Sequence, residues 1–222
     1  MRVTTLDQQL VLLTLDSRGA FRDRYKTEFA AAGGVLLELA LHARIDVPDG
    51  TVTAVDATPT GQPPLDAALE RIAASEHPYP TRRWVRELRR SAFENAVDAL
   101  TTAGLLRTEP HRTLGLLLTP RHPRTGEAAE RAERTLRKRL SDLVTCADEP
   151  ADARTACLAV LADAARLHRW AFPQTDARTV GERARELAAA GLIAPAVRGA
   201  VEVVQREAAA AVTAGAAGAT AY

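Results

Sequence analysis

Residues 28–55, EFAAAGGVLLELALHARIDVPDGTVTAV, decide the fold of this chain. From Glu28 to Arg44 the sequence is apolar on nearly every side of a helix, which is typical of a helix buried in a protein core. The Gly33-Gly34 pair lowers helix stability by about 1 kcal/mol per glycine relative to alanine, and a closely packed neighbour would explain it. Apolar and polar residues then alternate on both sides of Pro48-Asp49-Gly50. This pattern predicts a β-hairpin from Arg44 to Val55.

Outward from this stretch, helical periodicity dominates the chain. A second β-hairpin is predicted from Leu105 to Leu118, after a helix that ends before Gly104. The start of the chain, Thr5-Leu6-Asp7-Gln8, has the spacing of a capping box for a first apolar helix. We therefore predict a mainly α fold, a compact multi-helix domain with two β-hairpins. It occupies residues 1–212 as a single domain, and the Ala/Gly/Thr-rich residues 213–222 form a flexible tail.

The amino-acid composition argues against several classes of function. The chain has 222 residues with 29 basic and 28 acidic side chains, a formal net charge of +1, so it lacks the basic excess of a dedicated nucleic-acid binder. Its two cysteines form no close pair, its histidines have no metal-ligand spacing, and no catalytic constellation stands out. We expect no enzymatic activity, no cofactor and no metal. No apolar run is long enough to span a bilayer, which predicts a cytoplasmic protein that meets membranes only at their surface.

The densest cationic stretch lies between residues 82 and 90. On a helix, four of its arginines share one side at i, i+4, i+7 and i+8 spacing. Arginine presents a planar fork of donors that suits phosphate. The alternative interpretation is a solvated helix face neutralised by Glu87 and Glu94, and the sequence leaves both open. The five arginines of the stretch are Arg82, Arg83, Arg86, Arg89 and Arg90.

A second small cluster precedes the buried helix. Arg22, Arg24 and Lys26 lie beside Phe21 and Tyr25. Cations next to aromatic rings suit a membrane surface, where rings sit at headgroup depth and cations meet anionic lipid. The alternative is a surface loop whose two rings hold it against the core.

Several motifs, in order and at compatible spacing, resemble the Golgi phosphoprotein 3 family of peripheral phosphoinositide-binding proteins. The resemblance runs from about residue 5 to residue 210. The scarcity of lysine (Lys26 and Lys138 only) and the Arg/Ala richness favour a bacterial member. The motifs that carry the resemblance are Leu6–Gly19, Leu36-Leu37-Glu38-Leu39-Ala40-Leu41 with Arg44, Pro59-Thr60-Gly61 with Leu65–Leu69, Trp84, Ala103-Gly104-Leu105-Leu106, Thr119 with His122-Pro123, and Ala171-Phe172-Pro173.

The resemblance implies a mostly helical, non-catalytic protein with a shallow basic pocket for the headgroup of phosphatidylinositol 4-phosphate. It also implies protein partners of an adaptor. Of the four pocket residues that the family uses, only Arg90 carries over. The family's Trp falls on Asp23 or Arg24, its first Arg on Ala32 or Gly33, and its last Arg on Phe93. The sequence therefore predicts weak binding driven by bulk negative charge, with Arg90 as the main headgroup contact and Arg86, Arg22 and Arg24 as further contacts.

The resemblance further implies self-association through the second hairpin. Leu114, Leu116 and Leu118 alternate on one face of its strand, and Gly115 and Leu117 occupy the other. A strand this apolar invites pairing with another copy. The alternative is that both faces pack inside the monomer.

The function predicted from the sequence is thus that of a peripheral membrane adaptor. Its predicted partners are anionic lipid, other proteins and a second copy of the chain, with nucleic acid disfavoured. The second hypothesis is a winged-helix DNA-binding regulator, because a helix ending at Gly104 and followed by a hairpin has the order of a recognition helix and its wing.

Overall fold

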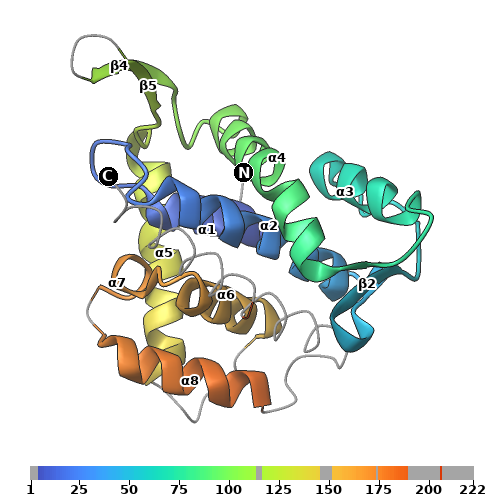
Figure 1. Ribbon diagram of the computed structural model, residues 1–222. Coiled ribbons are helices and arrows are strands. Elements are labelled where there is room, and N and C mark those ends of the chain that lie inside the picture. The colour runs from blue at the N-terminus through green and yellow to red at the C-terminus, as the bar shows by residue number, and fades with distance from the viewer. Residues whose placement is uncertain (1–4, 114–116, 146–151, 174, 190–205, 207–222) are drawn as a thin grey trace, which may run out of the picture.

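The computed structural model describes residues 5–113, 117–145, 152–173, 175–189 and 206. The described chain is a mainly α fold with two small antiparallel sheets, as predicted (Figure 1). The predicted boundary at residue 212 and the tail 213–222 lie outside the described residues. The elements are α1 (Leu6–Thr14), α2 (Arg24–Leu41), β1 (Ile45–Asp46), η1 (Pro48–Gly50), β2 (Thr51–Ala54), α3 (Pro63–Ala73), β3 (Tyr79–Pro80), α4 (Thr81–Thr102), β4 (Glu109–Thr113), β5 (Leu117–Arg121), α5 (Gly126–Thr145), α6 (Ala153–Ala164), α7 (His168–Ala171) and α8 (Ala177–Ala189).

Helix α2 lies at the centre of the core. It is buried along almost its whole length, and it packs against α1 and α4 (Figure 1). The sequence predicted a close neighbour at the glycine pair, and α1 is that neighbour at Gly34. A Cβ at Gly34 would come within 2.8 Å of the backbone nitrogen of Asp7, so only glycine lets α1 approach this closely.

The predicted hairpin at Arg44–Val55 is confirmed. Ile45 pairs with Ala54 and Asp46 with Thr53, and the turn between the strands contains Asp49 and Gly50 with positive φ. The structure adds a third strand that the sequence did not reveal. The two-residue strand β3 pairs with β2 on the side away from β1 and leads directly into α4.

The second hairpin exists, but its predicted bounds are wrong. Its strands are Glu109–Thr113 and Leu117–Arg121, and Leu105 and Leu106 are buried core residues rather than strand residues of the hairpin. Leu106 instead forms an isolated bridge with Arg124 below the hairpin. The ribbon of β4 and β5 projects away from the helices (Figure 1).

The base of this hairpin is fixed to the turn between α1 and α2. The backbone N–H of His122 donates a 2.7 Å hydrogen bond to the carbonyl of Gly19. Gly19 has a φ of +74°, and a Cβ there would lie 2.2 Å from the backbone nitrogen of Pro123. The hairpin therefore leaves the body at a point where only glycine fits.

The predicted capping box at the start of α1 does not form. Thr5 occupies the N-cap position without a side-chain hydrogen bond to the helix. The carboxylate of Glu38 accepts the 2.9 Å hydrogen bond from the Leu6 N–H instead. The buried α2 thus provides a cap that the local sequence was expected to provide.

Candidate anionic-lipid surface

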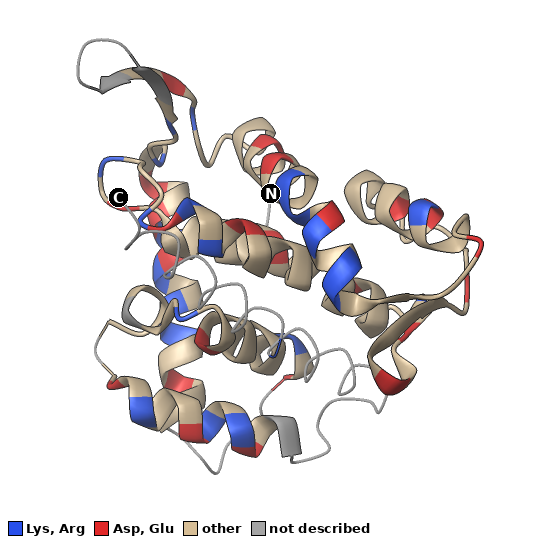
Figure 2. Cartoon of the chain, viewed as in Figure 1, with Lys and Arg blue, Asp and Glu red and all other residues tan. Residues whose placement is uncertain are grey.

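Three arginines form a stripe along α4. Arg82, Arg86 and Arg90 follow one another at i+4 spacing, which places them on one side of the helix, and all three are exposed. Figure 2 shows that the basic residues of α4 lie in its first half, next to β3. Within the part of the chain that the structure describes, no hydrogen bond or ion pair holds the guanidinium group of any of these three.

The alternative interpretation expected a helix face whose arginines are neutralised by carboxylates. A face of this kind lies on a neighbouring side of α4. Glu87 forms ion pairs with Arg83 at 2.7 Å and with Arg71 of α3 at 3.4 Å. Glu94 has the i+4 spacing from Arg90 but forms no ion pair with it among the described residues. The structure therefore separates one paired arginine, Arg83, from a stripe whose charge is not offset by a carboxylate in contact.

A carboxylate joins α4 to the beginning of α2. Glu28 Oε1 accepts a hydrogen bond from Arg24 Nε at 2.9 Å, and Glu28 Oε2 accepts one from Arg89 Nη1 at 3.2 Å. Glu28 lies 61 residues before Arg89, and nothing in the sequence spacing pointed to this contact. Glu28 thus joins Arg24 of α2 to Arg89 of α4, the neighbour of Arg90 in sequence, and offsets part of the charge of both arginines.

Aromatic rings lie beneath both of these arginines. The Cζ atom of Arg24 lies 4.9 Å from the centre of the Phe93 ring, and that of Arg89 lies 5.6 Å from Tyr25 and 5.3 Å from Phe29. Tyr25 keeps 43% of its surface exposed, whereas Phe93 is buried. Phe21 packs against the core, as the alternative expected, whereas Tyr25 lies in the first turn of α2 with its ring against Phe29 and partly exposed.

Arg22, the remaining predicted contact, lies apart from the stripe. It occupies the turn between α1 and α2, where its backbone N–H bonds the carbonyl of Thr14. Its charge helps to lower the pKa of Asp16, after the backbone hydrogen bonds of Ala20 and Arg18 to that carboxylate. No contact of the described residues joins Arg22 to Arg86 or Arg90, so the four predicted residues do not form one pocket.

Two of the four positions that the family's pocket would use are buried here. Ala32 and Gly33 are buried within α2, and Asp23 is the N-cap of that helix, where its carboxylate accepts a hydrogen bond from the Lys26 N–H. Phe93 is also buried, and it packs edge-on against Phe21 with ring centres 4.7 Å apart. The guanidinium over position 93 comes from Arg24 of another helix.

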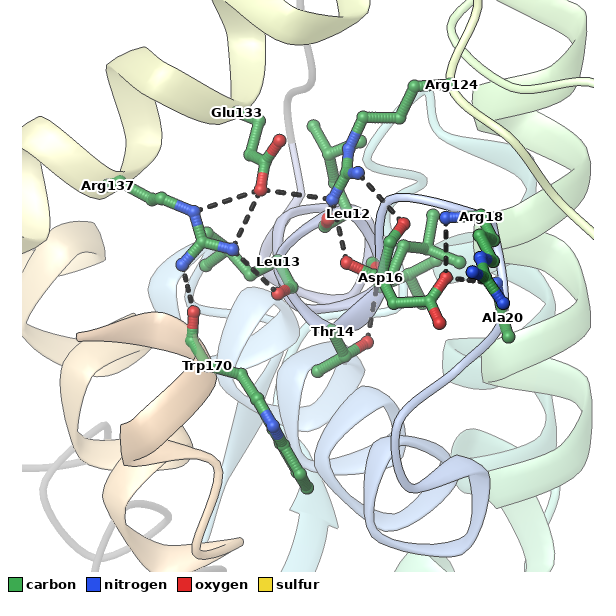
Figure 3. Close-up of polar contacts among 12 residues, drawn as sticks. Leu12, Leu13, Thr14, Asp16, Arg18, Ala20, Arg124, Glu133, Arg137 and Trp170 are labelled. Atoms are coloured by element: carbon green, nitrogen blue, oxygen red, sulfur yellow. Dashed lines mark hydrogen bonds and ion pairs between the residues drawn. The ribbon is translucent and has the colours of Figure 1, made fainter. Parts of the chain in front are cut away.

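A second cluster of arginines is structural. Figure 3 shows Arg124 and Arg137 on either side of Glu133, close to the last turn of α1. Arg124 donates to the carbonyls of Leu12, Leu15 and Asp16, while Arg137 donates to those of Leu13 and Trp170. Cations that bond the free carbonyls at a helix C-terminus also complement its dipole. The guanidinium groups of these two arginines stabilise the fold, so both residues are poor candidates for ligand binding.

The self-association residues are only partly covered by the structure. Leu114 and Leu116 lie outside the described residues. Leu118 belongs to β5, where its backbone pairs with Arg112. The prediction of self-association through this hairpin therefore stays a prediction.

Two other side chains that could take part in chemistry are buried. Cys157 lies in the core, and burial raises the pKa of its thiol to about 12. His122, at the hairpin base, has a pKa below its ordinary value because of burial and the nearby charge of Arg24. The described residues hold no group of three or more histidine, cysteine or acidic side chains placed to bind a metal. No described helix is both long and apolar enough to cross a membrane.

Comparison with known proteins agrees with the resemblance noted in the sequence. A search of curated proteins finds no significant match. The family model described as Golgi phosphoprotein 3 (GPP34) matches residues 6–204, nearly the whole chain and all of the described elements. The chain therefore belongs to the Golgi phosphoprotein 3 family.

Proposed function

We propose that this protein is a non-catalytic peripheral adaptor that binds anionic membrane surfaces through the stripe Arg82, Arg86 and Arg90. Membership of the Golgi phosphoprotein 3 family is consistent with an adaptor role. The observation that carries the lipid-binding part is that three exposed arginines of one helix side have no carboxylate in contact among the described residues. We place the protein at the cytoplasmic surface of a membrane.

Two features of the surrounding surface support this proposal. Tyr25 is exposed next to the cations, and a ring of this kind suits the headgroup layer, where one end is apolar and the other is wet. The half-exposed Arg24 of α2 and the partly exposed Arg89 of α4 lie at the Glu28 ion pairs, which offset part of their charge. A cation near an anionic membrane contributes about 1 kcal/mol of attraction, so several weak contacts would add up to measurable binding.

The test is co-sedimentation with vesicles of phosphatidylglycerol, phosphatidylinositol 4-phosphate or neutral lipid. At matched surface charge, the wild-type protein should bind both anionic vesicles at low salt with similar affinity and should not bind the neutral ones. Raising the ionic strength from about 0.01 M to about 0.15 M shortens the Debye length from about 30 Å to about 8 Å, and binding should weaken strongly. Tight, salt-resistant binding to the phosphoinositide alone would contradict binding by bulk charge.

Matched variants locate the surface. The triple substitution R82A/R86A/R90A should weaken binding about 100-fold, from about 1 kcal/mol per arginine. The control R131A/R134A/R178A removes the same charge from exposed arginines of α5 and α8 that already form ion pairs. Equal losses in both triples would show that net charge alone decides binding. Binding of duplex DNA in place of vesicles would favour the winged-helix hypothesis instead.

A further inference from the structure

The ion pairs of Glu28 have the form of an anion-binding site that already holds an anion. Its two carboxylate oxygens each take one arginine, Arg24 from the same helix and Arg89 from α4. The Glu28 side chain is only 10% exposed, whereas those of Arg24 and Arg89 are 49% and 30% exposed. The carboxylate is therefore set below the surface, with two accessible guanidinium groups above it.

The two guanidinium groups have a second support besides the carboxylate. Phe93 lies beneath Arg24, and Tyr25 and Phe29 lie beside Arg89. Stacking of a guanidinium on a ring is favourable in its own right. Both groups should therefore stay near their present positions if the charge of residue 28 is removed.

We propose that Glu28 determines headgroup selectivity by acting as a built-in counter-anion for Arg24 and Arg89. This inference rests on the proposed function. Carboxylate and phosphate oxygens accept the same charge-assisted hydrogen bonds from an arginine fork. Glu28 takes one donor of each guanidinium group and offsets their charge, so a terminal phosphate group of a lipid is attracted mainly to the open stripe of α4. The wild-type protein therefore does not distinguish a phosphomonoester headgroup from a phosphodiester one at equal surface charge.

The variant E28Q keeps the shape of the side chain and one acceptor oxygen, and removes the charge. Vesicles of phosphatidic acid, a phosphomonoester, and of phosphatidylglycerol, a phosphodiester, are compared at matched surface charge. E28Q should bind the phosphatidic acid vesicles at least about tenfold more tightly than wild type, as expected for two gained contacts. Its affinity for phosphatidylglycerol should rise by no more than about fivefold, the effect of one unit of charge.

The matched control is E87Q, which removes the same charge from a carboxylate on α4 that holds Arg83 and Arg71. It should bind both vesicles slightly and equally better than wild type. The double variant E28Q/R89A should lose the gain for phosphatidic acid. Inorganic phosphate at constant ionic strength should displace phosphatidic acid vesicles from E28Q if the site takes free phosphate. It should not displace them if the membrane context is needed.

The wild-type background gives an independent test that needs no substitution of Glu28. Because Arg89 is already paired, R89A should change binding to phosphatidylglycerol by less than about twofold, whereas R90A should weaken it about fivefold. Equal losses for R89A and R90A, or an E28Q variant that gains no preference for phosphatidic acid, would overturn the inference. Wild-type binding to phosphatidylglycerol would survive either outcome. Failure of both wild type and E28Q to bind any anionic vesicle would overturn the proposed function as well.

Discussion

The backbone N–H of Leu6 donates a hydrogen bond to the buried carboxylate of Glu38, 32 residues later in the chain. The same carboxylate forms a 3.0 Å ion pair with Arg154 of α6. One side chain of α2 thus caps α1 and holds α6. A buried carboxylate with this many partners is a structural group.

Replacing Glu38 should therefore destabilise the fold. Glu38→Ala removes the helix cap and the ion pair with Arg154, at a cost of about 3 kcal/mol in the free energy of unfolding. Glu38→Gln keeps an acceptor for the Leu6 N–H and should cost less. Urea unfolding measures both. The control Glu127→Ala breaks an exposed ion pair and should change stability by no more than about 0.5 kcal/mol. An equal effect of the two alanine variants would rule out the cap.

Asp7 should make stability depend on pH. Burial raises the pKa of its carboxyl from 3.8 to about 6, and the nearby charge of Glu38 adds to the rise. The folded state then holds a proton that the unfolded state loses near pH 4. This contribution is complete below pH 3.8 and is lost as the pH rises through about 6. Asp7→Asn should therefore gain stability relative to wild type by up to about 3 kcal/mol between pH 4 and pH 7. A constant difference across this range would contradict the buried acid.

Gly19→Ala should be far more damaging than Gly104→Ala. Both glycines have positive φ, but a Cβ at Gly19 meets the backbone of Pro123 at 2.2 Å whereas a Cβ at Gly104 meets nothing within 4 Å. Gly104→Ala should cost about 1–2 kcal/mol for the left-handed backbone alone. Gly19→Ala should cost at least about 2 kcal/mol more, because the hairpin base must shift. Similar unfolding midpoints for the two variants would show that the base yields easily.

Arg124 should not tolerate lysine. Its guanidinium reaches three carbonyls at and just beyond the end of α1, and Glu133 as well, from a side chain that is only 12% exposed (Figure 3). Lysine carries the charge but lacks the planar fork that makes such contacts together. Arg124→Lys should recover less than half of the stability that Arg124→Ala loses, which we expect to be about 3 kcal/mol. Recovery close to wild type in urea unfolding would mean that charge alone matters there.

The second hairpin is expected to mediate self-association. Light scattering of the wild-type protein at high concentration should give a multiple of the 23.8 kDa chain mass, and L114D/L116D should give the monomer mass. The control Val55→Asp places a charge on the other hairpin at a residue that is 59% exposed, and should leave the mass unchanged. A wild-type monomer mass would end this prediction.

The parts of the fold that could be predicted from the sequence are those specified locally. The apolar residues on nearly every side of α2 predict a buried helix, and Pro48-Asp49-Gly50 predicts a hairpin turn. Each signal lies within the element that it predicts. The second hairpin was predicted to begin too early in the chain, because Leu105 and Leu106 resemble strand residues in the sequence although they fill the core. Its real strands set Pro110 opposite Pro120, which local propensity disfavours and which a two-stranded edge ribbon tolerates.

The candidate site divides in the same way. Helical spacing placed Arg82, Arg86 and Arg90 on one side of a helix together with Arg89, and the structure separates Arg89 by pairing it with Glu28. The role of Glu28 was missed, because its contact with Arg89 depends on how α2 packs against α4. Arg22 was grouped with the others by its nearness to Arg24 in sequence, but the structure places it beside Asp16.

The first helix of the chain is completed by residues that are synthesised much later. Helix α1 has nine residues, too few to be stable in isolation, and its two ends are satisfied by Glu38 and by Arg124 and Arg137. During synthesis on the ribosome, the leucine-rich segment of α1 therefore leaves the exit tunnel well before its partners exist. A nascent chain released before residue 137 would lack part of this cap and would expose apolar surface to chaperones and proteases.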